Sequence, residues 1–335
     1  MAAAASADAA KPSPIEALAV ADLHKGPYLV FGGKTGWIGQ KMVTLLKERG
    51  CEAIAASSRL ENRSDVEAEI DSVKPKFVLN CAGVTGRPNV DWCEDHKAET
   101  IRVNVIGTMS LIDLCETRGI HVTNFATGCI YKYDDEHTIG GKGFTEEDKP
   151  NFTGSFYSLT KGMVETMCRA YKHVLTLRFR MPISDDLNHR NFVTKITKYA
   201  RVVDIPNSMT TLFDMLPVAA LMIHKGLTGV FNFTNPGAVS HNEILTHYRT
   251  HVDPTFWWAN FTEEQCNAIL KAERSNNTLD TTKLETALAD VRIPPIKEAV
   301  EGVFIRMAEN LKAEGAFPPV NFKDSEGIPK PADAK

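Results

Sequence analysis

The chain has 335 residues, 43% of them hydrophobic and 24% charged, and a formal net charge of -4. These values suit a globular protein with a large buried core, and such a weakly acidic chain carries no global basic field for nucleic acid. The 7 cysteines form no CxxC pair, and no apolar run approaches the roughly 18 residues of a membrane helix. We therefore expect a cytoplasmic protein with reduced thiols, no metal site and no membrane contact.

The chain opens with a small, polar, proline-broken segment, so residues 1–25 are expected to form a flexible tail without a secretory signal. Over residues 26–182, apolar runs typical of buried strands alternate with helix-periodic segments. This alternation predicts an α/β fold with a doubly wound parallel sheet, a Rossmann domain that carries the cofactor site and the catalytic residues. The expected strands are 27–32, 51–58, 76–83, 121–131 and 173–179, and the expected helices are 37–50, 64–75, 97–119 and 156–171.

Beyond residue 182 the alternation weakens. Residues 183–315 are expected to form a smaller, mixed substrate-binding part, and a strand at about 229–235 is expected to return to the main sheet. Residues 316–335 are expected to be a second flexible tail with a few residues pinned. The expected helices of this part are 241–251, 262–272 and 295–312.

A glycine-rich turn, FGGKTGWIGQ, joins the first strand to its helix and contains Gly33, Gly36 and Gly39. Residues without Cβ let the backbone approach a pyrophosphate, and the helix N-terminus offers free N–H groups and a positive dipole end. The motif in this context predicts a dinucleotide site. The other candidate contacts in the turn are Lys34, Thr35, Trp37 and Ile38.

The end of the second strand favours one cofactor over the other. NAD sites commonly place an acid there for the ribose 2′-hydroxyl, whereas this strand ends Ser57, Ser58, Arg59. An arginine beside hydroxyl groups suits a 2′-phosphate, and Lys34 adds a second positive charge. The sequence therefore predicts NADPH as the cofactor.

Tyr157 and Lys161 lie four residues apart in GSFYSLTKGMVE, on one face of the expected helix. An ammonium near a phenol favours the phenolate and would lower the pKa of Tyr157 toward the working pH. Tyr157 is therefore predicted to donate a proton to a carbonyl oxygen while the nicotinamide supplies hydride.

At this point the pattern resembles the extended short-chain dehydrogenase/reductase family over most of the chain. Thr127 in FATGCIY matches the family's catalytic Ser/Thr, beside Tyr157 and Lys161. The resemblance implies that Asn104 holds the catalytic lysine through water. It also implies that Asn80, Ala82 and Gly83 lie beneath the cofactor. A non-enzymatic NADPH sensor on this fold is the alternative, but such proteins usually lose the tyrosine or the lysine.

Cys129, two residues after Thr127, has no part in hydride transfer. On an extended segment, residues i and i+2 face one side, so Thr127 and Cys129 are both expected to face the substrate. A thiolate is a competent base for a carbon acid if a cation or donor stabilises it. The alternative is that Cys129 is a small buried residue, the commonest fate of a free cysteine.

A narrower resemblance joins GKTGWIG, AGVTGRPNVDWCE, ATGCIY, RMPIS, RNFVTKI and RSNNTLD. Together they resemble the bifunctional UDP-4-keto-6-deoxyglucose 3,5-epimerase/4-reductase family, the UDP-rhamnose synthase module. The resemblance implies that Cys129 and Lys195 invert C3 and C5 before NADPH reduces C4, giving UDP-β-L-rhamnose. His189 competes with Lys195 as the acid. The alternatives are a monofunctional NADPH-dependent 4-keto reductase, and an epimerase/reductase for a dTDP- or GDP-linked sugar.

Candidate substrate-binding residues follow the third strand, at the edge of the sheet where ligands bind. Arg274 resembles the family's arginine on the nucleotide pyrophosphate. The remaining substrate-binding candidates are Thr85, Arg87, Asn89, Asn191 and Asn207.

A homodimer through the long helices is a further family-based expectation.

Overall fold

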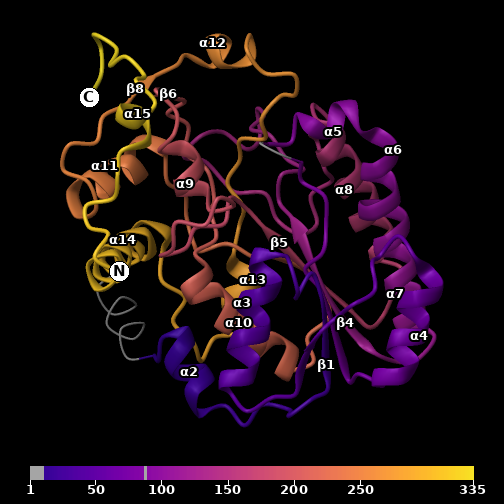
Figure 1. Cartoon of the computed structure of the whole chain (residues 1–335). Helices are drawn as coiled ribbons and strands as arrows, with labels where there is room; N and C mark the ends of the chain where they lie inside the picture. The colour runs from indigo at the N-terminus through magenta and orange to yellow at the C-terminus, as the bar shows by residue number, and fades with distance from the viewer. Residues whose placement is uncertain (1–10, 87–88) are drawn as a thin grey trace.

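The computed structural model describes residues 11–86 and 89–335 and contains a six-stranded parallel sheet (Figure 1). The order of its strands is β2-β1-β3-β4-β5-β7. The order reverses between β1 and β3, and in such sheets ligands bind outside the carboxyl ends of the strands at this switch point. The six strands span Tyr28–Phe31 (β1), Ala53–Ala55 (β2), Phe77–Asn80 (β3), His121–Thr127 (β4), Val174–Phe179 (β5) and Gly229–Asn232 (β7).

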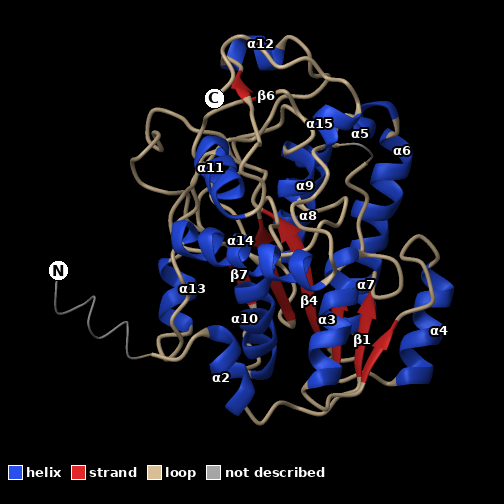
Figure 2. Ribbon diagram, turned by 60° about the vertical axis from the view of Figure 1, so that its left-hand side comes forward, coloured by secondary structure: helices blue, strands red, loops and turns tan. Residues whose placement is uncertain are grey.

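Helices cover both faces of the sheet and enclose one apolar core on each side (Figure 2). On one face Met42 and Leu46 pack with Leu216 and Phe231, and on the other Val66 and Leu111 are among the side chains packed with the strands. This arrangement confirms the predicted doubly wound sheet. The first face carries α2 (Pro14–Val20), α3 (Trp37–Glu48) and α10 (Leu212–His224), and the second carries α4 (Arg63–Val73), α7 (Thr108–Glu116) and α8 (Phe156–Cys168).

The long helix expected over 97–119 consists of three consecutive helical segments. It begins as α6 (Lys97–Thr100), continues as a π-helical segment η1 (Ile101–Gly107), and ends as α7; a short helix, α5 (Trp92–Asp95), precedes it. Gly107 lies against Leu60, since a Cβ on this glycine would stand 2.8 Å from the Leu60 Cβ. π-Helical turns are frequent at functional sites, and this one carries Asn104.

The C-terminal half adds a smaller layer beyond the ends of the main strands. It has its own core, which includes Ile244, Trp258 and Phe304, and a two-stranded parallel sheet of β6 (Arg201–Val202) and β8 (Ala259–Asn260). The helix expected over 262–272 is much shorter. None of the helices in the described residues combines the length and apolar character needed to cross a bilayer. The helices here are α9 (Phe192–Ile196), α11 (His241–His251), α12 (Glu263–Asn267), α13 (Thr282–Ala287), α14 (Ile296–Ala313) and α15 (Phe322–Ser325).

The expectation of a flexible tail over residues 1–25 is wrong for its described part. Residues 14–20 form α2, and the Ser13 backbone amide donates to Glu16 at 2.8 Å, which begins the helix. Leu18 is fully buried and Leu23 is 3% exposed, because α2 packs against α10. The small residues and prolines of this segment suggested disorder. The segment nevertheless contains a short helix whose apolar side packs into the core.

The second expected tail, residues 316–335, is also ordered against the C-terminal part. Lys323 is completely buried: its ammonium donates to the Trp257 carbonyl and lies 3.6 Å from the centre of the Phe256 ring. Burial lowers the pKa of Lys323 to about 8. The chain end is held by an Arg201–Asp333 ion pair of 2.6 Å. Contacts of a cation with aromatic rings compensate for part of the hydration that it loses on burial. The polar composition of residues 316–335 does not reveal such contacts, and for that reason it suggested a flexible tail.

A buried histidine at the start of α11 should make stability depend on pH. Burial lowers the pKa of His241 from 6.5 to about 4, against the opposing charge of Asp204. The folded state therefore holds the neutral ring, and stability present above pH 6.5 is lost as the pH falls toward 4. That difference corresponds to about 3 kcal/mol of unfolding free energy.

Urea unfolding at about pH 7.5 and about pH 4.5 measures this loss. The His241→Gln variant lacks the titrating ring and should lose about 2.5 kcal/mol less than the wild type between these conditions, since pH 4.5 is still above the folded pKa. Equal losses in the two proteins would show that His241 is not responsible.

Candidate active site at the carboxyl ends of the strands

The glycine turn after β1 is too compact for side chains. A Cβ on Gly36 or on Gly39 would stand 2.6 Å or 2.4 Å from the Gly32 carbonyl oxygen. Gly32 itself has a φ of +79°, a left-handed conformation that favours glycine. The sequence motif did not include Gly32, although the GG pair was a signal for it. This close approach of backbone to a helix N-terminus fits the phosphates of a dinucleotide.

The other predicted residues of the turn divide into two groups. Lys34 and Thr35 are exposed, whereas Trp37 is buried and its indole Nε1 donates to Asp186 at 3.2 Å. Ile38 packs against the core of the first face. Lys34 and Thr35 are therefore free to meet a ligand, while the Trp37 and Ile38 side chains anchor α3.

At the end of β2, four hydrogen-bond donors surround the Glu69 carboxylate. Glu69, on α4, accepts hydrogen bonds from the backbone amides of Ser57 and Ser58, at 2.7 and 2.8 Å, and from both hydroxyl groups. Burial raises the pKa of the Glu69 carboxyl, but these hydrogen bonds outweigh it and leave the pKa below its ordinary value. Arg59 is exposed and pairs with Glu61 at 2.6 Å. Four donors converging on one anion form a cradle that also suits a phosphate.

Asn80 and Asn104 shape the segment after β3. The Asn80 Nδ2 donates to Asn124 at 3.1 Å, and its Oδ1 accepts from the amide of Ala82 at 3.2 Å. The Asn104 side chain makes two hydrogen bonds of 2.7 Å with the backbone of Val84. The Asn104 side chain therefore holds the loop after β3, and its link to Lys161 through water, which the resemblance implies, stays a prediction. Gly83 lies beside it, since a Cβ would stand 3.4 Å from the Asn104 Oδ1.

Thr127, Cys129 and Tyr157 meet at the end of β4. Thr127 is the last residue of β4, and its hydroxyl lies near the Tyr157 phenol, where it opposes the rise in the phenol's pKa. The chain then turns, with the Cys129 amide donating to the Thr127 Oγ1 at 3.1 Å. The expectation that residues 127–129 form an extended segment is therefore wrong. A turn closed by the threonine hydroxyl, and not strand alternation, brings the thiol to the phenol.

The helix α8 presents Tyr157 and Lys161 to this strand end. Ser155 caps the helix by accepting the amide of Ser158 at 3.1 Å. Burial raises the pKa of Tyr157, the nearby Cys129 thiol adds to that effect, and the Thr127 hydroxyl opposes it. Burial also lowers the pKa of Lys161. The pKa of Tyr157 therefore shifts in the direction opposite to the predicted lowering by Lys161, because desolvation of the phenol dominates.

Lys195 lies on α9, which Asn191 caps by accepting the amide of Val193 at 3.2 Å. Lys195 is half-buried, and burial lowers its pKa, with the nearby Arg190 adding to the effect. His189, the competing acid, is exposed. A partly desolvated ammonium transfers a proton more readily than a fully hydrated one.

The predicted substrate-binding residues differ in their exposure and in the contacts that they make. Thr85 is exposed, Asn89 accepts the amide of Asp91 at 2.8 Å, and Arg87 lies outside the described residues. Arg274 pairs with Asp91 at 2.8 Å, so the segments after β3 and after β8 are joined there.

The two remaining candidates are structural in this state. Asn191 is fully buried and its amide donates to the carbonyls of Ser184 and Asp186, besides capping α9. Asn207 is also fully buried, and its Oδ1 accepts from Arg180 at 2.6 Å. Neither side chain presents a polar atom to a substrate here, because helix capping and internal pairing use them.

Comparisons with known proteins identify the family of the chain. The model of the NAD dependent epimerase/dehydratase family matches residues 28–200. An Arabidopsis thaliana bifunctional dTDP-4-dehydrorhamnose 3,5-epimerase/dTDP-4-dehydrorhamnose reductase is 55% identical over 82% of this chain and 90% of its own length. A trifunctional UDP-glucose 4,6-dehydratase/UDP-4-keto-6-deoxy-D-glucose 3,5-epimerase/UDP-4-keto-L-rhamnose-reductase of the same plant is 56% identical over 77% of this chain, which spans 39% of that protein.

Solved structures show the same fold. The L780 UDP-rhamnose synthase of Acanthamoeba polyphaga mimivirus aligns with a TM-score of 0.80 and 42% identity, over 84% of this chain and all of that one. A Bacillus anthracis dTDP-4-dehydrorhamnose reductase in complex with NADP aligns over 84% of this chain and 99% of its own, with a TM-score of 0.72 but 18% identity, and so supports the fold alone. The chain therefore belongs to the NAD dependent epimerase/dehydratase family and, within it, to the epimerase/reductase enzymes.

Proposed function

We propose that the protein is an NADPH-dependent 3,5-epimerase/4-reductase that converts UDP-4-keto-6-deoxyglucose into UDP-β-L-rhamnose. The observation that carries the proposal is the meeting of Thr127, Cys129 and Tyr157 at the end of β4. A reductase alone needs the hydroxyl and the phenol; the thiol beside them supplies a base. UDP is proposed as the nucleotide because the trifunctional plant relative and the mimivirus protein are named for UDP sugars, whereas the bifunctional relative is named for dTDP.

The epimerisation comes first in this mechanism. A ketone at C4 acidifies the C–H bonds at C3 and C5, and reduction would remove that ketone. The Cys129 thiolate takes a proton from carbon, and the Lys195 ammonium returns one to the opposite face. Thr127 and Tyr157 donate hydrogen bonds to the enolate oxygen meanwhile.

The reduction then uses the same ketone. When bound, NADPH supplies a hydride to C4. Tyr157 donates the phenolic proton to O4, and its raised pKa supports this role as a proton donor. Lys161, buried on the same helix, stabilises the phenolate that remains.

Cofactor preference is proposed to rest on the cradle at the end of β2. Arg59 and the donors of Ser57 and Ser58 would hold the 2′-phosphate in place of the Glu69 carboxylate. The Arg59→Ala variant should therefore bind NADPH about tenfold more weakly, the lower end for a charge-assisted hydrogen bond at an exposed site, while its affinity for NADH stays the same.

Nicotinamide fluorescence titration measures both affinities. Arg63→Ala is a matched control, because Arg63 is also exposed and pairs with Asp113 at 3.0 Å on the neighbouring helix. Equal weakening of NADPH and NADH in the Arg59 variant would refute a role in reading the 2′-phosphate.

The proposed function is tested by incubating the enzyme with UDP-4-keto-6-deoxyglucose in D2O, first without NADPH. Deuterium should enter C3 and C5, and UDP-rhamnose should form once NADPH is added. Absence of exchange, with reduction of a 4-keto-rhamnose substrate retained, would establish the monofunctional reductase instead. Faster turnover of the dTDP- or GDP-linked sugar would reassign the nucleotide.

A homodimer is also proposed. Ile106 on η1 and Met163 and Met167 on α8 are large apolar side chains that are at least 40% exposed, on two segments that contact each other. Such a pair of helices can form an isologous interface with a second copy. Analytical ultracentrifugation of the full chain tests this.

A further inference from the structure

Arg180, which directly follows β5, is a guanidinium in the interior of the protein, 1% exposed. All of its five N–H donors are used, and each acceptor is electrically neutral. They are the carbonyls of Ser208 (3.2 Å), Gly128 (2.9 Å) and Ser275 (2.9 Å), the Ser275 hydroxyl (3.1 Å) and the Asn207 amide oxygen (2.6 Å).

A second buried arginine shows what is missing. Arg178, two residues earlier, holds the buried Glu165 carboxylate through hydrogen bonds of 2.8 and 2.6 Å. Among the described residues no carboxylate lies within ion-pair distance of Arg180. Buried charges in proteins are almost always paired, because an uncompensated charge in the interior is costly. Arg180 thus stands as a buried cation without a counter-anion.

The side chain of Arg180 lies directly against the turn that carries Cys129. A Cβ on Gly128 would stand 2.9 Å from the Arg180 Cγ, so the glycine between Thr127 and Cys129 makes room for the arginine. Arg180 also donates to the Gly128 carbonyl. Burial lowers the pKa of Arg180, and the ionised forms of Cys129 and Tyr133 oppose that effect. The neighbouring groups able to carry a negative charge are therefore this thiol and a phenol.

We propose that Arg180 is the counter-charge of the Cys129 thiolate and so a positioning residue for the epimerisation base. The inference rests on the proposed function, in which Cys129 takes the proton from carbon. The thiolate accepts that proton and becomes a thiol, the electron pair moves into the enolate, and Arg180 keeps its proton throughout. The Tyr157 phenol on α8 and the Thr127 hydroxyl, which also lie near Cys129, are neutral donors at pH 7.

The test follows the rate at which iodoacetamide alkylates Cys129 as the pH is raised, with peptide mass spectrometry to separate it from the other cysteines. The Arg180→Gln variant should react at least tenfold more slowly at pH 7 than the wild type, because only the thiolate reacts. Arg180→Lys keeps the positive charge and should restore most of the rate.

Asn277→Ala is the matched control. Its Nδ2 also donates to the Gly128 carbonyl, at 3.1 Å, but carries no charge. Equal slowing in the Arg180→Gln and Asn277→Ala variants would overturn the proposal in favour of loop positioning. If Arg180→Gln fails to fold, the wild type decides: half-maximal alkylation of Cys129 must come below about pH 8.5, the ordinary value for a free cysteine. Because alkylation needs no substrate, its outcome is distinct from deuterium exchange, which tests the proposed function.

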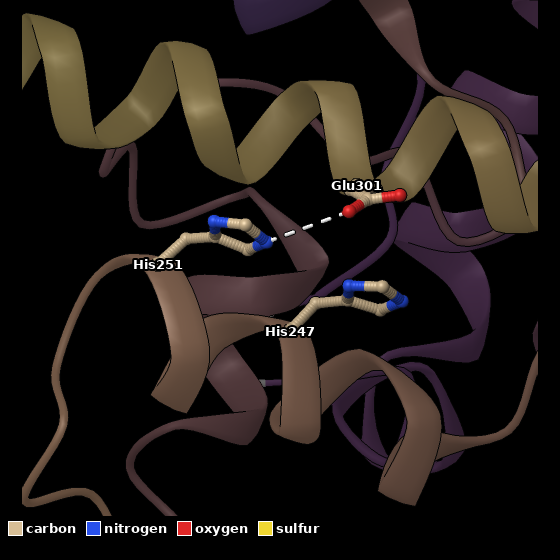
Figure 3. A group of neighbouring side chains, drawn as sticks. All are labelled: His247, His251 and Glu301. Carbon is tan, nitrogen blue, oxygen red and sulfur yellow. Dashed lines mark ion pairs between the residues drawn. The ribbon is translucent and has the colours of Figure 1, made fainter.

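An independent group of side chains lies on the C-terminal helices. His247 and His251 project from successive turns of α11 toward Glu301 on α14 (Figure 3). The ligand-type atoms of the three residues all lie within 4.8 Å of one another, and the His251 Nε2 is 3.8 Å from the Glu301 Oε1. Two imidazoles four residues apart on one helix face and a carboxylate from a second helix form a ligand set that Zn²⁺ accepts, with further positions left for water.

We infer that this group binds a divalent cation of the Zn²⁺ type and thereby joins α11 to α14. Imidazole nitrogens are common zinc ligands, and the Glu301 carboxylate supplies the third donor atom. The sequence led us to expect no metal site. That expectation did not consider that α14 packs against α11 and brings Glu301 to the two histidines.

Thermal unfolding of the chelator-treated full chain tests the inference, with ZnCl2 and MgCl2 as the probes. Zn²⁺ but not Mg²⁺ should raise the midpoint, as a ligand bound only by the folded state does. The rise should be lost in the His247→Gln/His251→Gln variant and kept in a His24→Gln/His224→Gln control, another histidine pair with ring centres 5.5 Å apart. A rise that persists unchanged in the first variant, or no rise in the wild type, would overturn it.

Discussion

Replacing Cys129 by alanine should lower the rate of deuterium exchange at C3 and C5 of UDP-4-keto-6-deoxyglucose by about 10³-fold. This factor is the usual contribution of a positioned general base. Reduction of a substrate that is already epimerised should stay within about tenfold of the wild type, because Thr127, Tyr157 and Lys161 remain. Proton NMR measures the exchange, and the loss of NADPH absorbance measures the reduction.

The reciprocal control is Tyr157→Phe. This variant lacks the phenolic proton and should lose reduction by a similar factor. The thiolate should still exchange protons at carbon, at a lower rate, because Thr127 alone then donates to the enolate oxygen. Loss of both activities in the Cys129→Ala variant would mean that the thiol supports the whole site. Retention of exchange in that variant would assign the base to another residue.

Replacing Arg178 by methionine should lower the free energy of unfolding by about 3–5 kcal/mol, the cost of leaving a buried charge without its partner. Arg178 is fully buried and holds Glu165, itself 3% exposed, through two hydrogen bonds. It also donates to Asn232 at 3.0 Å, so it ties β5 to α8 and β7. Urea unfolding measures the change as a shift in midpoint.

Two variants control this experiment. The Arg178→Met/Glu165→Leu pair removes both buried charges and should recover most of the loss. Arg118→Met removes a surface arginine that pairs with Glu67 and Asp71, and should cost less than about 1 kcal/mol. A loss below about 1 kcal/mol in the Arg178 variant as well would contradict the assigned role of the buried pair.

The sequence by itself determined the fold and pointed to the residues proposed for the centre of the site. Alternating apolar runs and helix-periodic segments are local patterns, and they predicted the parallel sheet that the structure has. The glycine turn and the four-residue spacing of Tyr157 and Lys161 also depend on local backbone geometry. Cys129 was noticed because a thiol beside a reductase hydroxyl has no role in hydride transfer, and the structure does bring it to the phenol.

Other features depended on which segments pack together. The periodicity of Pro14–Val20 is too short to predict a helix, and its order comes from packing against α10. Asn191 and Asn207 looked like ligand-binding amides, but helix capping and Arg180 use them. The expected lowering of the Tyr157 pKa considered a charge four residues away and not the burial of the phenol.

The contrast between Arg178 and Arg180 shows the limit most clearly. The two residues have the same chemistry and lie two positions apart, so no local pattern distinguishes them. Glu165 on α8 reaches one, and the hydrogen-bond acceptors that the other meets are neutral groups from several separate loops. Local periodicity and turn chemistry decide where strands, helices and motifs lie. The charge that a buried side chain meets is decided by segments far apart in the chain, because it depends on which of them the folded core brings together.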